Sequence, residues 1–194
     1  MNAPVRLTRA DWVRPTVVLS IMLVVAVVYL RWQGRIWWCA QGDYTPFSLQ
    51  TWSPHNSQHV FDAYSFSHVL HGVFFFAVLW FARRRLNWSN RFLIATALEL
   101  GWELLENSPI IINRYREATV SLGYTGDSIL NSMGDTASCA LGFWLAGRLG
   151  LWRSIGLWIV IEAGLLLWIR DNLTLNVLML IYPIDAIKQW QSAM

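Results

Sequence analysis

Long apolar runs separated by short polar segments dominate the sequence. A helix that crosses a membrane needs about 20 predominantly apolar residues, and somewhat fewer suffice where anchoring residues flank it. The segments that meet this condition are 15–32, 64–82, 92–112, 128–147 and 154–169. The pattern therefore predicts an all-α fold, a polytopic transmembrane helical bundle of five spans that forms one integral membrane domain over residues 1–194.

Two terminal segments bear on the number of spans. The tail 172–190 is apolar but is interrupted by Pro183, so it is predicted to be a short sixth span, a re-entrant segment or an interfacial helix. The first apolar run follows three arginines, as in a signal peptide, yet no small-x-small cleavage pattern comes directly after it. We expect this run to be retained as the first span.

Basic residues cluster before the first span, between spans two and three, and between spans four and five. These residues are Arg6, Arg9, Arg14, Arg83, Arg84, Arg85, Arg91, Arg148 and Arg153. If each segment crosses once, all three clusters lie on one side, which the positive-inside rule assigns to the cytoplasm. The N-terminus is then cytoplasmic in a bacterial inner-membrane protein, and 33–63 and 113–126 are outer, periplasmic loops.

The composition agrees with a lipid environment. The chain is 55% hydrophobic and 14% charged, whereas a soluble domain is about 25% charged. The net charge of +3 and the pI near 9.1 would fit a nucleic-acid partner, but the basic residues stand in short clusters beside apolar runs. We therefore expect membrane lipid as a partner and no nucleic acid.

Polar and ionisable side chains inside the predicted spans fall into three stripes. The members are Ser65, His68 and His71 in the second span, Glu99, Glu103 and Glu106 in the third, and Asp127, Asn131 and Asp135 at the start of the fourth. Steps of three and four place each set on one helical face, and all three sets lie toward the outer side. Because such groups are costly in lipid, they should converge in a shared pocket, with His68, Glu103, Asp127 and Asn131 in direct or one-water contact.

The pocket has two readings: a structural network that holds the bundle together, or a reactive or binding site. In the second reading the candidate catalytic residues are His68, Glu103, Glu106, Asp127, Asn131 and Asp135, with substrate bound by Arg114, Arg116, His71 and Glu99. Glu103 or Glu106 would act as base and His68 as acid. His68 and Glu103 are also candidate ligands of a divalent metal, although the histidine spacing is a weak metal signal.

Several other residues carry alternatives. His55 and His59 could pair if their segment were helical, but we expect solvated loop histidines. Glu162 either forms a hydrogen bond to the neighbouring span or belongs to the site. Cys139 is predicted to pack between helices, and Cys39 to be an exposed thiol or to have no role. The glycines expected at close-packed helix contacts are Gly72, Gly101, Gly134, Gly142 and Gly147.

Four segments carry a resemblance to known proteins: 67–72 (SHVLHG), 99–109 (ELGWELLENSP), 113–119 (NRYREAT) and 123–135 (GYTGDSILNSMGD). From about residue 30 onward, the chain resembles an uncharacterised family of bacterial membrane proteins, a domain of unknown function. More distantly it resembles the VanZ-like family in the order His68, Glu103, Glu106, Arg116, Asp127, Asn131 and Gly134. That resemblance implies a connection with the cell envelope.

Two functions follow from the sequence. The first is an envelope hydrolase or transferase acting at the outer leaflet on a lipid or lipid-linked substrate, with Arg114 and Arg116 binding an anionic group such as phosphate. The second is a non-enzymatic membrane protein that binds a lipid, an ion or a partner protein in envelope assembly or regulation.

Overall fold

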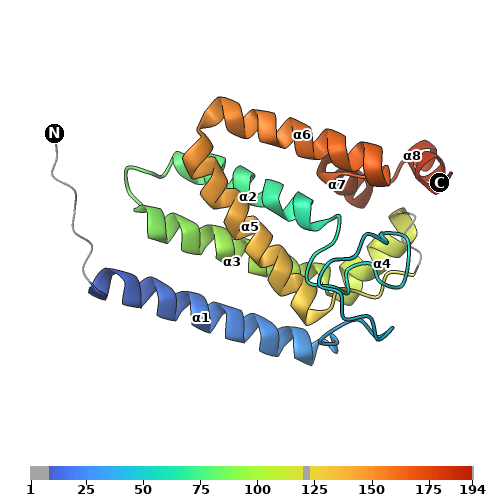
Figure 1. Cartoon of the computed structure of the whole chain (residues 1–194), viewed down its shortest axis with the longest axis horizontal. Coiled ribbons are helices and arrows are strands. Elements are labelled where there is room, and N and C mark those ends of the chain that lie inside the picture. Colours follow the sequence, from blue (N-terminus) through green and yellow to red (C-terminus); the bar gives the residue numbers. More distant parts are fainter. Residues whose placement is uncertain (1–8, 120–122, 194) are drawn as a thin grey trace.

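The computed structural model describes residues 9–119 and 123–193, and this part of the chain is helical without a β-strand. The long helices are α1 (Arg9–Trp32), α2 (Ser65–Trp80), α3 (Trp88–Glu106), α5 (Ile129–Leu149) and α6 (Leu151–Ile169). The short helices are α4 (Pro109–Ala118), α7 (Leu173–Ile181) and α8 (Asp185–Ser192). The long helices run back and forth beside one another, and the short helices gather at one end of the bundle (Figure 1).

Glycines bring α2 and α5 into direct backbone contact at the centre of the bundle. A Cβ atom at Gly72 would lie 2.0 Å from the carbonyl oxygen of Cys139, and one at Gly142 would lie 2.0 Å from that of Val69. Only glycine allows the two helices to approach this closely. The same prediction is wrong for Gly101, because a Cβ there would have no neighbour within 4 Å.

Within the described residues, two helices are long and apolar enough to cross a membrane: the Val13–Trp32 part of α1, and α6. In both, only 11% of the apolar window is buried within the protein, which distinguishes them from the core helix of a soluble domain. An apolar helix that is left uncovered needs a partner other than water. These two helices indicate that the protein associates with a membrane.

The predicted third span ends earlier than expected. Helix α3 ends at Glu106, and a new helix, α4, begins at Pro109. The side chain of Ser108 accepts a hydrogen bond from the N–H of Ile111, and proline occupies the first turn of α4. A serine cap followed by proline is a strong helix start, so the first part of the segment predicted to be an outer loop, residues 113–118, is helical.

The C-terminal tail also divides into two helices, at Pro183 as predicted. Helix α7 has 9 residues and is therefore about 14 Å long, roughly half the thickness of a bilayer core. Helix α8 follows with 8 residues. A sixth span formed by one straight helix is therefore wrong for this tail.

The segment 33–64 packs as an ordered loop over the start of α5. The N–H of Ser128 donates to the carbonyl of Ser57 at 2.9 Å. A Cβ atom at Gly134 would lie within 2 Å of the carbonyl oxygen of Val60, so this glycine lets the loop lie directly on the helix. The loop thereby closes the end of the bundle at which α2 and α5 begin.

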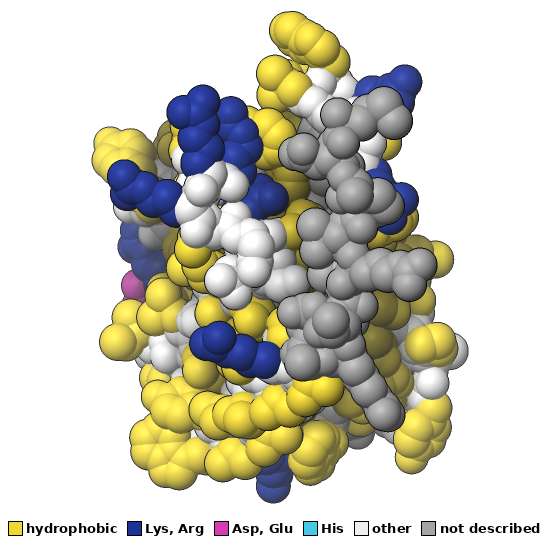
Figure 2. All heavy atoms as spheres, turned by 90° about the vertical axis from the view of Figure 1, so that its left-hand side faces the viewer, with side chains coloured by type: hydrophobic (Ala, Val, Ile, Leu, Met, Phe, Trp, Pro, Cys, Tyr) yellow, Lys and Arg dark blue, Asp and Glu magenta, His cyan; other side chains and the backbone are white. Residues whose placement is uncertain are grey.

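Exposed arginines occupy the opposite end of the bundle. Arg14, Arg84, Arg148 and Arg153 are all exposed, and they lie near the start of α1 and at the α2–α3 and α5–α6 connections. Figure 2, which faces this end, shows several Lys and Arg side chains on it, with hydrophobic side chains around and below them. The described arginines of the three basic clusters named above therefore lie at one end, as the spacing of the apolar runs predicts, and Arg6 lies outside the described residues.

Candidate functional site

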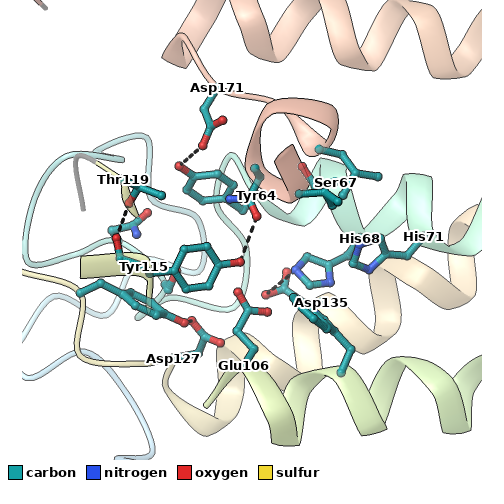
Figure 3. Close-up of a pocket in the computed structure, with 17 residues that line it drawn as sticks. Tyr64, Ser67, His68, His71, Glu106, Tyr115, Thr119, Asp127, Asp135 and Asp171 are labelled. Atoms are coloured by element: carbon teal, nitrogen blue, oxygen red, sulfur yellow. Dashed lines mark hydrogen bonds and ion pairs between the residues drawn. The ribbon is translucent and has the colours of Figure 1, made fainter. Parts of the chain in front are cut away.

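A cavity of about 60 Å³ lies at the end of the bundle remote from the exposed arginines. Its wall is formed by α2, α3, α4, α5 and α7 together with the loop before α2 (Figure 3). The ionisable residues that line it are His68, His71, Glu106, Asp127, Asp135 and Asp171, with the tyrosines Tyr64, Tyr115 and Tyr124. No lysine or arginine is among the described residues of this wall.

Glu99 holds the two histidines of α2. Its Oε1 atom lies 2.5 Å from Nδ1 of His68, and its Oε2 atom lies 3.0 Å from Nδ1 of His71. A carboxylate at Nδ1 keeps a proton on that nitrogen and leaves Nε2 with its lone pair in the neutral ring. Nε2 of His68 faces Oδ2 of Asp135 at 3.8 Å.

One carboxylate oxygen of Asp135 is fixed by a hydrogen bond, and the other oxygen is available to a second partner. The hydroxyl of Ser65 donates to its Oδ1 at 2.7 Å. Its Oδ2 atom is the one that faces His68. Both side chains are buried, so the available oxygen and the imidazole nitrogen meet away from bulk solvent.

Glu103 is fully buried, yet neither of its carboxylate oxygens accepts a hydrogen bond from a described residue. The nearest ionisable partner is Nδ1 of His68, 3.4 Å from Oε1. Burying a carboxylate without hydrogen bonds is costly, so a proton or a cation must compensate it. His68, Glu103 and Asp135 offer one donor atom each within 4.8 Å of one another, which is a set that can hold a metal ion.

The outer part of the cavity is built around Asp127. This carboxylate accepts hydrogen bonds from the hydroxyl of Tyr124 at 2.8 Å and from the side-chain amide of Asn107 at 2.9 Å. Burial nevertheless raises the pKa of Asp127 above its ordinary value. Two hydrogen bonds therefore do not offset the loss of water around this acid.

Asp171 lies on the α7 side of the same cavity. It accepts a hydrogen bond from the hydroxyl of Tyr64 at 3.0 Å. Burial raises its pKa to about 6, against the opposing effect of that hydrogen bond. The cavity therefore has acidic groups on several sides, without a fixed cation among the described residues that line it.

The structure brings together most of the predicted site residues, but three of them point elsewhere. The side-chain amide of Asn131 donates to the carbonyl of His59 at 2.8 Å, which anchors the loop. Nε of Arg114 donates to the carbonyl of Leu180 at 2.8 Å, and Nε of Arg116 to that of Tyr124 at 2.5 Å. His68 and Glu103 are thus in contact, and Asp127 lines the same cavity as His68, whereas Asn131 does not join them.

Glu162 hydrogen-bonds to the neighbouring helix α7, which is one of its two expected roles, and it does not line the cavity. Its carboxylate accepts hydrogen bonds from the N–H groups of Leu173 and Thr174 at 2.9 and 3.2 Å, and from the Thr174 hydroxyl. These are the first residues of α7, where free N–H groups and the helix dipole favour a negative charge. Glu162 is therefore a cap that orients α7 beside α6.

Sequence reasoning missed the tyrosines and amides of the cavity. The residues are Tyr64, Asn107, Tyr115, Tyr124, Asp171 and Asn176. All lie in connections, at helix caps or in the short helices α4 and α7, outside the stripes from which the site was predicted. Tyrosines beside ionisable stripes were the available signal, because a buried phenol requires a polar partner.

The loop residues also differ from expectation. His59 is completely buried, so its prediction as a solvated histidine is wrong, and His55 is only partly exposed. The two rings do pair, with Nδ1 of His55 and Nε2 of His59 3.2 Å apart, although the segment is not helical. Cys39 is buried rather than exposed, and Cys139 is buried as predicted.

Fold and site together define a class: an all-helical protein with membrane-type apolar helices and a buried cluster of histidine and carboxylate side chains. Residues 30–193 match the family described as a protein of unknown function, DUF2585, and the chain belongs to this family. No solved structure matches the chain.

Named relatives carry the same kind of description. A UPF0314 protein of Paracoccus denitrificans is 45% identical over 174 residues, which cover 90% of each chain. A UPF0314 protein of Agrobacterium fabrum is 48% identical over 89% of this chain and 87% of its own. These matches support the uncharacterised family, while the distant VanZ-like resemblance stays a prediction.

Proposed function

We propose that this protein is a multi-pass protein of the bacterial inner membrane that binds a divalent cation in a pocket near the outer, periplasmic face of that membrane. Five antiparallel long helices, with the basic clusters at one end, support five spans and a cytoplasmic N-terminus. Helix α2 has 16 residues, or about 24 Å, which a locally thinned bilayer accommodates.

The observation that carries cation binding is the state of Glu103. Glu103 is fully buried and accepts no hydrogen bond from a described residue, and it lies behind His68 and Asp135, which line the cavity. The three side chains offer donor atoms within 4.8 Å of one another. One imidazole and two carboxylates suit Mn²⁺, Fe²⁺ or Zn²⁺. Glu99 orients His68 from behind, as outer carboxylates orient metal-binding histidines elsewhere.

Charge and size favour a cation over the anionic substrate that the arginines predicted. The wall is acidic, and the guanidinium groups of Arg114 and Arg116 are bonded to backbone carbonyls. A volume of about 60 Å³ holds an ion with a few water molecules, whereas a lipid headgroup would require the cavity to widen.

The test measures bound metal in detergent-purified protein. After chelation, the protein is titrated with Mn²⁺ and the free ion is followed by electron paramagnetic resonance. The wild type is expected to bind Mn²⁺. Glu103→Gln should weaken binding at least about tenfold, because changing even a residue that only supports a metal ligand costs about that much affinity. Glu117→Gln, which changes an exposed acid of α4, is the control. Equal Mn²⁺ affinity in both variants and the wild type would contradict the proposal.

A second candidate is hydrolysis or transfer on a lipid-linked substrate. Its support is the α7 side of the cavity, where Leu173 and Val177 place apolar surface beside the polar groups. His68, oriented by Glu99, would take a proton from the attacking water or hydroxyl. Vesicles of bacterial lipid extract incubated with the protein should then yield a product that His68→Gln does not form; the absence of any product with the wild type counts against this candidate.

A further inference from the structure

Four metal-binding side chains meet in the ordered loop 33–64, outside the pocket. Sγ of Cys39 lies 3.4 Å from Nδ1 of His55, and that nitrogen lies 3.2 Å from Nε2 of His59. Oδ2 of Asp43 lies 3.8 Å from the His55 nitrogen and 3.9 Å from the His59 nitrogen. A thiol, two imidazoles and a carboxylate thus share one space.

Hydrogen bonds from neighbouring groups orient the donor atoms of these side chains toward one another. Nδ1 of His59 lies 2.5 Å from the carbonyl oxygen of Thr45, so the ring proton resides there and the lone pair of Nε2 faces His55. The N–H and hydroxyl of Thr45 both donate to Oδ1 of Asp43 at 2.9 Å, which leaves Oδ2 toward the histidines. Carbonyl and hydroxyl partners of this kind orient metal ligands.

A proton on His55 holds only one pair of these atoms at a time. Nδ1 of His55 faces a sulfur, a nitrogen lone pair and a carboxylate oxygen, and its single proton is donated to one of them. Cys39 and His59 are buried, so their donor atoms meet away from bulk water. A cation placed between the four atoms satisfies all of them.

The spacing of the atoms fits a tetrahedral ion. With bonds of about 2.0–2.1 Å to nitrogen and about 2.3 Å to sulfur, zinc holds its donor atoms roughly 3.3–3.6 Å apart. The four measured separations, 3.2–3.9 Å, are within a few tenths of an ångström of this range, and Cys39, His55 and His59 offer donor atoms within 4.8 Å of one another. The two histidines lie four residues apart, and so do Cys39 and Asp43, a spacing common among zinc ligands.

We propose that the loop binds one Zn²⁺ ion through Cys39 Sγ, Asp43 Oδ2, His55 Nδ1 and His59 Nε2. Four protein ligands make a closed, structural site rather than one that leaves a position for substrate. The ion joins the two halves of the loop, and His59 in turn is joined to α5 through its carbonyl and Asn131. Zinc thereby stabilises the cover over the outer end of the bundle.

Cobalt(II) tests this proposal, because a bound thiolate gives a charge-transfer absorption band that oxygen and nitrogen ligands do not give. Full-length protein in detergent, first stripped with a chelator, is expected to develop the band with one equivalent of Co²⁺ and to lose it when Zn²⁺ is added. Cys39→Ser should abolish the band, whereas Cys139→Ser, which changes the other cysteine, should retain it.

Asp43→Asn separates the site from folding, since Asp43 is partly exposed and its change leaves the core intact. This variant should keep the band and weaken Co²⁺ binding more than about tenfold. Glu103→Gln should keep both the band and its affinity, because the loop site does not depend on the pocket. The absence of the band in the wild type, or its persistence in Cys39→Ser, would overturn the proposal.

Discussion

At the scale of single residues, Asp171 shows how the cavity responds to pH. Its carboxyl group is buried beside the hydroxyl of Tyr64, and burial raises its pKa from 3.8 to about 6. The folded protein therefore binds this proton more tightly than the unfolded chain does. Linkage then requires the stability contributed by this group to be full below pH 3.8 and to be lost as the pH rises through about 6.

Asp171→Asn should remove this pH dependence while keeping the acceptor for Tyr64. We expect the free energy of unfolding of the wild type to fall relative to that of the variant between about pH 4 and 6. The size is on the order of 3 kcal/mol at about 1.4 kcal/mol per pKa unit. Thermal unfolding followed by tryptophan fluorescence in detergent measures it. A wild-type-minus-variant difference that is constant across this pH range would refute the assignment.

At the scale of elements, the contact between α2 and α5 sets the position of the site. Backbone meets backbone at Gly72 and Gly142, so the separation of the two helices is determined by the absence of side chains. His68 on α2 and Asp135 on α5 reach each other because of this close approach. A wider spacing would separate the donor atoms without changing any of them.

Gly142→Ala tests that spacing. The new Cβ would lie 2.0 Å from the carbonyl oxygen of Val69, so the helices must move apart, at a cost of about 1–3 kcal/mol for overpacking. A lower unfolding temperature and weaker Mn²⁺ binding are the expected results. Gly101→Ala is the matched control: its Cβ meets nothing within 4 Å, and alanine favours a helix over glycine by about 1 kcal/mol. Equal melting temperatures for the two variants would contradict this account.

At the scale of the whole molecule, the charged and apolar surfaces are arranged along one axis of the protein. The exposed arginines Arg14, Arg84, Arg148 and Arg153 lie at one end, the cavity and the ordered loop lie at the other, and exposed apolar helices run between them (Figure 1). This arrangement is typical of a protein that crosses a bilayer with the cavity on the outer side.

Cysteine labelling decides the topology. Tyr44 in the loop is 83% exposed and is therefore a suitable probe. With a membrane-impermeant maleimide, Tyr44→Cys should react in spheroplasts, and Arg84→Cys only after the membrane is opened. The wild type, in which both cysteines are buried, measures the background. Labelling of both variants from the same side would end the five-span assignment.

The sequence by itself determined the helices and the faces that carry polar groups. Apolar runs set the approximate bounds of the long helices, and steps of three and four residues placed His68, Glu103 and Asp135 on inward faces, because helical geometry is local. The break at Ser108–Pro109 was equally local and was missed because the apolar run continues through it. The apolar pattern therefore predicted which helices exist and which way they run better than it predicted the residues at which they end.

Only the tertiary structure decided what each polar atom faces. Asn131 shares a stripe with Asp135, yet its amide donates a hydrogen bond to the loop backbone. The two side chains lie one turn apart along α5 and therefore meet different neighbours. In the same way, Arg114 reaches the end of α7. The group formed by Cys39 and His59 depends on a loop without periodicity, whose course follows from its contacts with α5. Non-local packing sets such contacts, and no spacing within the sequence contains them.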